Sequence, residues 1–432
     1  MVKQVSMPVA LAAVAGLAAG TAGAQQGPAS GPVAVYWMSA ATSTGMGAMG
    51  AGMGAGGPPG AMGPGGRPSG PPPQARRPGL GAMLGGALGG GNPYAGAGGY
   101  GGQNPYAQRG AGGGMPPGVA AMMGGGRETR SLTLQLGSSL RPTSGEPNAG
   151  HLAPPDLQAG QRLPLVTPQV VPPEPPEPGQ PPQMTQRPQG KMLIYWGCGE
   201  HAAAPIVIDF AKLGPNMPVP NIPFVAANGG RPPSPGRYAT YGEWPNERTR
   251  LSIPPEGSLV GAHAVQGNYS PDIRFNLGPN QDFLAPLNIT STNATPGGGK
   301  RVTWTPVPGA TGYYAWLFGA GGGRNGPVVM WSSGSKANML GALTDYLPPS
   351  EVRRLIGDGM VMGPQTSECI VPSEVVKASP FGMLSMIAYG EETNLSDPPR
   401  PAKGAWNLKW TVKVRRKSTT GALLGMPGAG DD

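Results

Sequence analysis

The chain has 432 residues, of which 76 are glycine and 56 are proline, while charged residues make up only 12%. This much glycine and proline is typical of low-complexity sequence, whereas the low charge excludes a highly charged disordered protein. The formal net charge is +9 at pH 7. Long parts of the chain cannot build a hydrophobic core, so we expect β-strands at the apolar islands and linkers between them.

Residues 1–24 are typical of a secretory signal peptide. Lys3 gives a positive start, residues 9–19 form an apolar run, and Ala22-Gly23-Ala24 fits a small-residue cleavage site. The pattern predicts a mature chain that begins at Gln25 and is periplasmic, secreted or at the cell surface. The alternative is a buried apolar helix. We expect no transmembrane span, because no later run reaches the roughly 20 apolar residues that a membrane helix needs.

Residues 25–44 contain the first predicted strand, centred on the apolar run 33–38. Residues 45–127 follow as a Gly/Met/Pro-rich insertion, which we expect to be disordered because glycine loses more conformational freedom on ordering than other residues. Thioethers are soft ligands suited to Cu(I), so copper binding by this tract is an alternative function. The methionines in question include Met46, Met49, Met53, Met62, Met83, Met115, Met122 and Met123.

Residues 128–285 are predicted to form an N-terminal and middle β-region, interrupted by a Pro-rich linker at 168–190. Short apolar or alternating runs favour strands. These runs cover residues 132–136, 161–167, 192–196, 206–210, 258–265 and 273–277.

Three aromatic residues of this region, Tyr241, Trp244 and Tyr269, are candidate ligand contacts. Their rings suit stacking on sugars or on a partner chain, although core packing explains aromatic residues more often.

The C-terminal third carries the clearest fold signal. Residues 302–305 alternate apolar and polar side chains, a Pro/Gly turn follows at 306–309, and residues 313–318 form an aromatic-rich second strand. This pattern resembles strands B and C of fibronectin type III-like domains. The resemblance implies that Trp304 and Tyr313 pack in the core between two sheets.

The resemblance extends over about residues 286–418, with a flexible tail predicted at 419–432. Within it we expect strands at 287–292, 328–331, 379–389 and 406–414 and a helix at 349–356. The predicted fold class is therefore mostly β: β-sandwich domains with long disordered insertions and a C-terminal fibronectin type III-like sandwich.

The chain has two cysteines, Cys198 and Cys369, which an oxidising compartment would join in a disulfide. Cys198, Glu200 and His201 also form the densest cluster of reactive side chains. With His263 they suggest a hydrolase or a metal-dependent enzyme as the alternative function. A cysteine committed to a disulfide can serve in neither role.

Four basic residues near the C-terminus, Lys409, Lys413, Arg415 and Lys417, share one face of the last predicted strand. They are candidate contacts to an anionic polysaccharide, lipopolysaccharide or membrane surface, with a solvated sheet face as the alternative. We expect no nucleic-acid partner, because the chain shows an export signal and no recognised nucleic-acid-binding fold.

The sequence as a whole favours an exported, non-enzymatic binding or structural protein of the periplasm or cell surface. We expect a polysaccharide or protein partner and no cofactor, and an oligomer or filament stays open as an alternative.

Overall fold

The computed structural model describes residues 31–45, 128–169, 190–212, 225–249, 253–322, 326–338, 341–401, 403 and 406–425. The segment predicted to be a signal peptide, the Met-rich tract, most of the Pro-rich linker and residues 426–432 lie outside the described residues. Among the described residues, no helix has the length and hydrophobicity that crossing a membrane requires.

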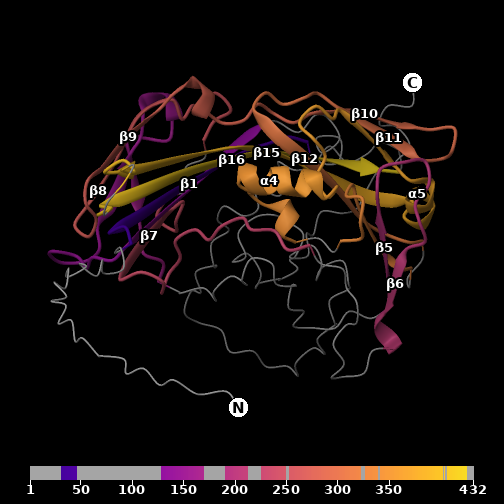
Figure 1. The fold of residues 1–432 in the computed structure, drawn as a ribbon, viewed down its shortest axis with the longest axis horizontal. Helices are drawn as coiled ribbons and strands as arrows, with labels where there is room; N and C mark the ends of the chain where they lie inside the picture. Colours follow the sequence, from indigo (N-terminus) through magenta and orange to yellow (C-terminus); the bar gives the residue numbers. More distant parts are fainter. Residues whose placement is uncertain are drawn as a thin grey trace, which may run out of the picture.

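The described strands form three sheets (Figure 1). The largest, here called the main sheet, contains in spatial order β6 (Ile206–Asp209), β5 (Lys191–Trp196), β13 (Val328–Ser332), β12 (Ala310–Ala320), β15 (Phe381–Asp397), β16 (Trp410–Leu424), β1 (Ala34–Ser43), β2 (Thr129–Ser138) and β7 (Thr240–Trp244). The first cover sheet contains β4 (Arg162–Leu165), β3 (Ala149–Leu152), β8 (Gly261–Gly267) and β9 (Ile273–Leu277). The second contains β10 (Ile289–Ala294), β11 (Lys300–Trp304) and β14 (Glu368–Val371).

The first cover sheet packs on the β1, β2 and β16 part of the main sheet and forms the first sandwich. Its core is contiguous and includes Tyr36, Leu134 and Val412 from the main sheet. Leu163 and Val265 face them from the cover sheet. At one edge Val166 and Glu243 exchange two backbone hydrogen bonds of 3.0 and 3.1 Å, which joins the end of β4 to β7 and closes this side of the sandwich.

The second cover sheet packs on β12, β13 and β15 and forms the second sandwich. Its core joins Val302 and Trp304 of β11 to Leu317 and Trp331 of the main sheet. The opposite face of the main sheet is covered here by α4 (Pro349–Gly357), whose Val352 and Leu355 pack against Tyr314 and Ile387. A shorter helix, α5 (Ser373–Ala378), follows β14.

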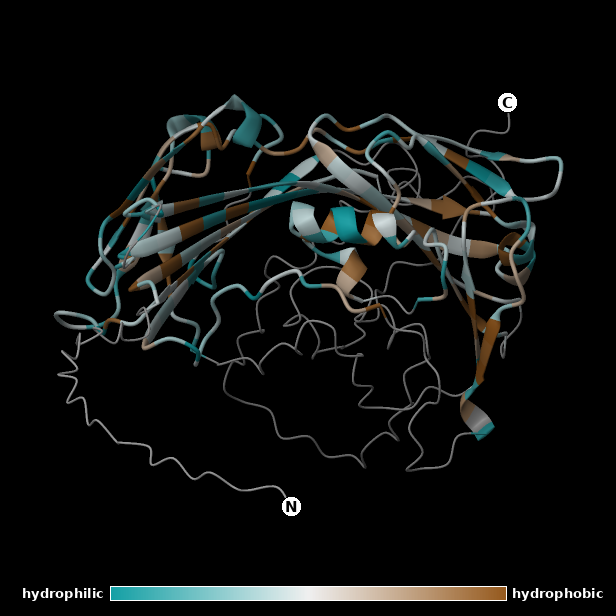
Figure 2. Cartoon of the chain, in the orientation of Figure 1, coloured by the Kyte–Doolittle hydropathy of each residue, from teal (hydrophilic) through white to brown (hydrophobic). Residues whose placement is uncertain are grey.

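Two long strands run through both sandwiches. β15 has 17 residues and β16 has 15, and they pair along nearly their whole length. Their register shifts between Tyr389 and Glu392, where β15 passes from the second core to the first. Figure 2 shows hydrophobic and hydrophilic segments alternating along these strands. Parallel to β16 lies β1, with Ala34 opposite Trp410 and Ser43 opposite Thr419.

The predicted fold class is confirmed as mostly β, and a helix forms at the expected place, α4. Residues 302–318 form the two predicted strands, β11 and β12, which lie in different sheets, so the Pro/Gly turn crosses from one layer to the other. The rings of Trp304 and Tyr313 lie 5.6 Å apart in the core of the second sandwich.

Two boundaries differ from the prediction. Residues 419–424, assigned to a flexible tail, are the end of β16 and pair with β15. The predicted domain boundary at residue 286 does not divide the structure into two separate sets of sheets. The main sheet is continuous, and its strands β15 and β16 belong to both sandwiches. The first error arises because residues 415–420 of β16 are Ser, Thr, Arg and Lys, so no apolar alternation marks them as a strand.

Candidate ligand-binding site

The loop of residues 141–148, here called the cleft loop, connects β2 to β3 and is held in place by one side chain. The Asn268 amide donates hydrogen bonds to the carbonyls of Ser144 (2.7 Å) and Glu146 (2.9 Å). The backbone N–H of Asn148 donates to Asn268 Oδ1 at 2.9 Å. The backbone N–H of Thr143 donates to the Asn268 carbonyl at 2.8 Å. These bonds give a loop outside the sheets a fixed conformation, as a preformed binding surface requires.

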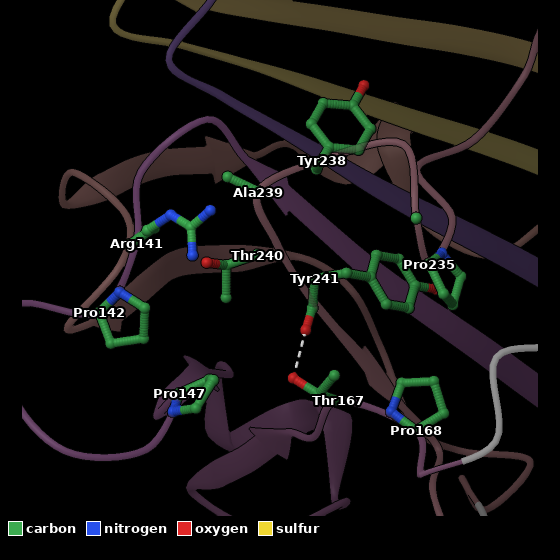
Figure 3. Close-up of a pocket in the computed structure, with 11 residues that line it drawn as sticks. Arg141, Pro142, Pro147, Thr167, Pro168, Pro235, Tyr238, Ala239, Thr240 and Tyr241 are labelled. Carbon is green, nitrogen blue, oxygen red and sulfur yellow. Dashed lines mark hydrogen bonds between the residues drawn. The ribbon is translucent and has the colours of Figure 1, made fainter.

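A cleft of about 370 Å³ lies on one side of this loop (Figure 3). Its walls are mostly proline and tyrosine, which present rigid apolar surfaces and lose little rotamer freedom when a ligand binds. We call it the proline cleft. The residues that line it are Arg141, Pro142, Pro147, Thr167, Pro168, Pro235, Gly236, Tyr238, Ala239, Thr240 and Tyr241.

The segment leading into β7 positions the two tyrosines. The Tyr238 ring lies directly against the backbone of Gly137 on β2, so close that a Cβ at residue 137 would lie 2.6 Å from the ring. Thr167 donates a 2.6 Å hydrogen bond from its hydroxyl to the Tyr241 carbonyl. The hydroxyl of Tyr241 donates to Glu243 at 2.6 Å. Burial raises the pKa of Glu243, and the hydrogen bond from Tyr241 opposes that shift.

A second cleft, also about 370 Å³, is lined by other residues of the cleft loop, and most of its lining residues are polar. The Arg162 guanidinium lies across Gly150, where a Cβ would come within 2.6 Å of its Cζ atom. Amide, carboxylate and guanidinium groups here supply both donors and acceptors, the chemistry that recognises hydroxyl and peptide groups. We call it the amide cleft. Its lining residues are Ser144, Glu146, Asn148, Arg162, Gln266, Gly267 and Asn268.

The three aromatic residues predicted to contact a ligand do not lie at one site in the structure. Tyr241 lines the proline cleft, although it is only 3% exposed. Trp244 and Tyr269 lie instead in the core of the first sandwich, 2% and 1% exposed, so they present no ring to a ligand at the surface. Sequence reasoning missed Tyr238, whose signal was the cluster of prolines that precedes it.

The predicted basic face is engaged in contacts within the chain. Lys409, which precedes β16, pairs with Asp397 at 3.3 Å. Lys413 pairs with Glu392 and lies over the Trp37 ring. These carboxylates neutralise the two lysines locally.

The other two basic residues are packed on Tyr346. The Arg415 guanidinium lies 4.4 Å from the centre of that ring and 5.0 Å from the centre of the Trp37 ring. Lys417 pairs with Asp345 at 2.8 Å and lies 4.3 Å from the Tyr346 ring centre. Burial would raise the pKa of Asp345, but Lys417 and Arg415 lower it to about 2. This arrangement is a salt-bridged, aromatic-packed surface and differs from the open basic stripe that the sequence suggested.

The Cys198, Glu200 and His201 cluster is not assembled as a reactive group. Cys198 forms the disulfide with Cys369. Glu200 accepts a hydrogen bond from the Thr295 hydroxyl at 2.6 Å. The Nδ1 atom of His201 lies 3.1 Å from a carboxylate oxygen of Glu374.

His263, the fourth member of that hypothesis, lies in the other sandwich, where it is 2% exposed. Among the described residues, no group of three or more His, Cys, Asp and Glu side chains is placed to hold a metal ion. The methionines of the copper hypothesis lie outside the described residues.

Comparisons with protein-family models, with curated proteins and with solved structures found no match to this chain.

Proposed function

We propose that the protein is an exported, non-enzymatic binding protein that holds a cell-surface polysaccharide across the proline cleft and the amide cleft. The observation that carries the proposal is the cleft loop, which is pinned by Asn268 and forms one wall of each cleft. Because one loop borders both, a single extended ligand can contact an apolar and a polar surface at once.

The chemistry of the two clefts matches the two kinds of surface on a sugar. A pyranose ring has an apolar face of C–H groups, which packs on tyrosine and proline rings. Its edge carries hydroxyl groups, which hydrogen-bond to amides, carboxylates and guanidinium groups. The signal-like segment at residues 1–24 supports export to a compartment where such polymers occur.

We further propose that residues 286–418 form a fibronectin type III-like domain that has been fused into a larger sheet. The order of β10, β11 and β14 facing β13, β12, β15 and β16 supports this relationship, as does the contact between Trp304 and Tyr313. Such domains usually act as spacers or binding modules, which agrees with a non-enzymatic role.

The proposal is tested by measuring binding of the mature protein to a panel of bacterial surface polysaccharides by calorimetry. Tyr238→Ala removes a wall of the proline cleft, and Arg162→Ala removes a wall of the amide cleft. We expect each variant to weaken binding at least tenfold, about 1.4 kcal/mol. Arg301→Ala is the matched control, because Arg301 is exposed on the second cover sheet, paired with Glu368, far in the fold from the cleft loop.

Thermal unfolding of each variant separates lost contacts from lost structure. Equal affinity of Tyr238→Ala, Arg162→Ala and the unchanged protein would rule out the clefts as the binding site. Binding of a proline-rich peptide with no binding of any polysaccharide would assign the same clefts to a protein partner instead.

A further inference from the structure

We propose that Tyr36, His151 and His263 form an acid-sensitive latch that holds the two sheets of the first sandwich together. The three side chains, here called the histidine latch, cross the core from one sheet to the other. Tyr36 is on β1 of the main sheet, whereas His151 and His263 are on β3 and β8 of the first cover sheet. All three are at most 2% exposed.

Hydrogen bonds connect the latch from end to end. The Tyr36 hydroxyl lies 2.9 Å from Nδ1 of His151. Nε2 of His151 lies 3.1 Å from Nδ1 of His263. Nε2 of His263 lies 2.7 Å from the Leu259 carbonyl oxygen. Every ring nitrogen of both histidines therefore has one partner.

The positions of the protons follow from the last of these bonds. A carbonyl oxygen only accepts, so Nε2 of His263 carries a proton and donates it to Leu259. In the neutral ring, Nδ1 of His263 then accepts, and Nε2 of His151 donates to it. The remaining nitrogen, Nδ1 of His151, accepts from the Tyr36 hydroxyl. The whole chain is satisfied with both histidines neutral.

Acid disrupts this chain in two steps. A proton on Nδ1 of His151 would make the Tyr36 hydroxyl turn from donor to acceptor. A second proton, on Nδ1 of His263, would point at the N–H of His151. Two donors would then face each other, and the hydrogen bond between the two rings would be lost. Two positive charges would then lie next to each other inside the core, and burying an unpaired charge is strongly unfavourable.

Among the residues that the structure describes, no carboxylate acts on the two histidines to offset that charge. Leu163 and Val265 flank His151 in the sheet, and Phe275 stacks on His263 with ring centres 5.0 Å apart. On the main-sheet side, Leu136 and Val412 flank Tyr36. Among the described residues, the other titratable group that acts on the latch is the phenol of Tyr269, which is also buried.

The pKa shifts agree with this geometry. Burial, and then the neighbouring His263, lower the pKa of His151 well below its ordinary value of 6.5. Burial lowers the pKa of His263, partly offset by its hydrogen bond to Leu259. Burial, and then Tyr269, raise the pKa of Tyr36, and burial raises that of Tyr269, so both phenols stay neutral in acid.

The sign of the pH effect follows from proton linkage. Below about pH 6.5 the unfolded chain binds protons at both histidines, whereas the folded chain does not, because the folded pKa values lie lower. The stability that the latch contributes is complete above that pH. It begins to fall below about pH 6.5, and the loss is complete once pH has fallen through the folded pKa values. For each proton that the chain takes up on unfolding, the unfolding equilibrium constant rises by up to about tenfold for every pH unit by which pH falls.

The latch is also connected to the amide cleft. β3 begins next to Asn148, and β8 ends at Gly267, both of which line that cleft. Separation of β3 and β8 from the main sheet would therefore deform the cleft and release its ligand in acid. This last consequence rests on the proposed function, whereas the latch itself does not.

Hydrogen exchange of the full-length mature protein between pH 7.5 and 5.0, corrected for the intrinsic rate, tests the latch without any ligand. We expect β3 and β8 to lose protection as pH falls below about 6.5, up to about a hundredfold per pH unit when both histidines take up a proton. Peptides of β11 and β14 in the second sandwich should keep theirs. Equal protection of β3 and β8 at both pH values would overturn the proposal.

Two variants assign the effect to the histidines. The double substitution His151→Gln with His263→Gln should remove the pH dependence, while His201→Gln, which changes the exposed histidine of the second sandwich, should keep it. Retention of the full pH dependence in the double variant would overturn the proposal. If that variant does not fold, the single substitution His151→Gln removes one of the two titrating groups and should lower the pH dependence from up to about a hundredfold to up to about tenfold per pH unit. An unchanged pH profile there would overturn the proposal equally.

Discussion

The first and second sandwiches share β15 and β16 but differ in what holds their two layers together. In the first, a buried chain of hydrogen bonds runs from Tyr36 through His151 to His263. In the second, a disulfide between Cys198 and Cys369 ties the segment after β5 in the main sheet to β14 in the cover sheet. Within the described part of the chain, the helix α4 adds a third layer to the second sandwich only.

This difference shows that one continuous sheet can support two units, one sensitive to acid and the other sensitive to reductant. Hydrogen-bonded neutral histidines respond to protons, whereas a disulfide responds to reductants. We therefore expect acid to affect the first sandwich and reductant to affect the second. The following changes are ordered from the largest expected effect on stability to the smallest.

Removal of the disulfide is expected to have the largest effect on stability, and to affect the second sandwich more than the first. Cys198 and Cys369 are 171 residues apart, so replacing both by serine frees a long loop in the unfolded chain. The entropic model predicts a loss of about 5 kcal/mol in the free energy of unfolding. Guanidinium unfolding measures the loss, and hydrogen exchange locates it. If β3 and β8 lost as much protection as β11 and β14, the two sandwiches would be one cooperative unit and the comparison would fail.

A cavity in the second core should be costly and insensitive to pH. Trp304→Ala removes the ring that packs 5.6 Å from the ring of Tyr313. We expect a loss of about 3–5 kcal/mol, because the removed atoms leave a cavity that neighbours fill only in part. Thermal unfolding at pH 7.5 and at pH 5.5 should show the same loss relative to the unchanged protein. A loss that grows in acid would show that the second sandwich contains a titrating contact as well.

Gly137→Ala changes the first sandwich where it borders the proline cleft. The added Cβ would lie 2.6 Å from the Tyr238 ring, so the ring must move away from β2. Overpacking of this kind costs about 1–3 kcal/mol. Gly31→Ala is a suitable control, since a Cβ there meets nothing within 4 Å. Chemical unfolding of both variants compares them, and equal stability would mean that Tyr238 is not held against Gly137 in solution.

The smallest effect concerns the fixed end of the cleft loop. The Thr240 hydroxyl donates a 2.7 Å hydrogen bond to the Leu140 carbonyl. Thr240→Val keeps the shape and removes the donor, for which we expect a loss of about 0.5–1.5 kcal/mol. Thr240→Ser, which keeps the hydroxyl, should lose less. The reverse order in thermal unfolding would assign the role of this residue to packing and not to the hydrogen bond.

The sequence predicted those strands in which one face is apolar and the other polar, as at residues 132–136 and 302–305. It failed for residues 415–424, where polar side chains are buried without any apolar alternation. Arg416 is 6% exposed because its guanidinium donates hydrogen bonds to the carbonyls of Glu391 and Asn280. Partners of this kind lie 25 and 136 residues away, so no local pattern reveals them.

The candidate site was predictable only in part, for the same reason. Tyr241 was selected from the sequence, but the proline cleft arises where residues 141–147, 167–168 and 235–241 meet. The histidine latch is a further case, because Tyr36 and His151 are 115 residues apart and His151 and His263 are 112 apart. A lone histidine in a sequence gives no sign of the residue that will accept its proton.

The pairing of β1 with β16 has a consequence for the order of events during biosynthesis. β1 lies between β2 and β16 in the main sheet, and its contact with β16 joins residue 34 to residue 410. The ribosome must therefore reach residues 410–419 before this pairing can form. Contacts that close such long loops slow folding, because the chain loses loop-closure entropy before it gains the free energy of the contact. The nascent chain therefore lacks this central pairing until residue 419 has been synthesised.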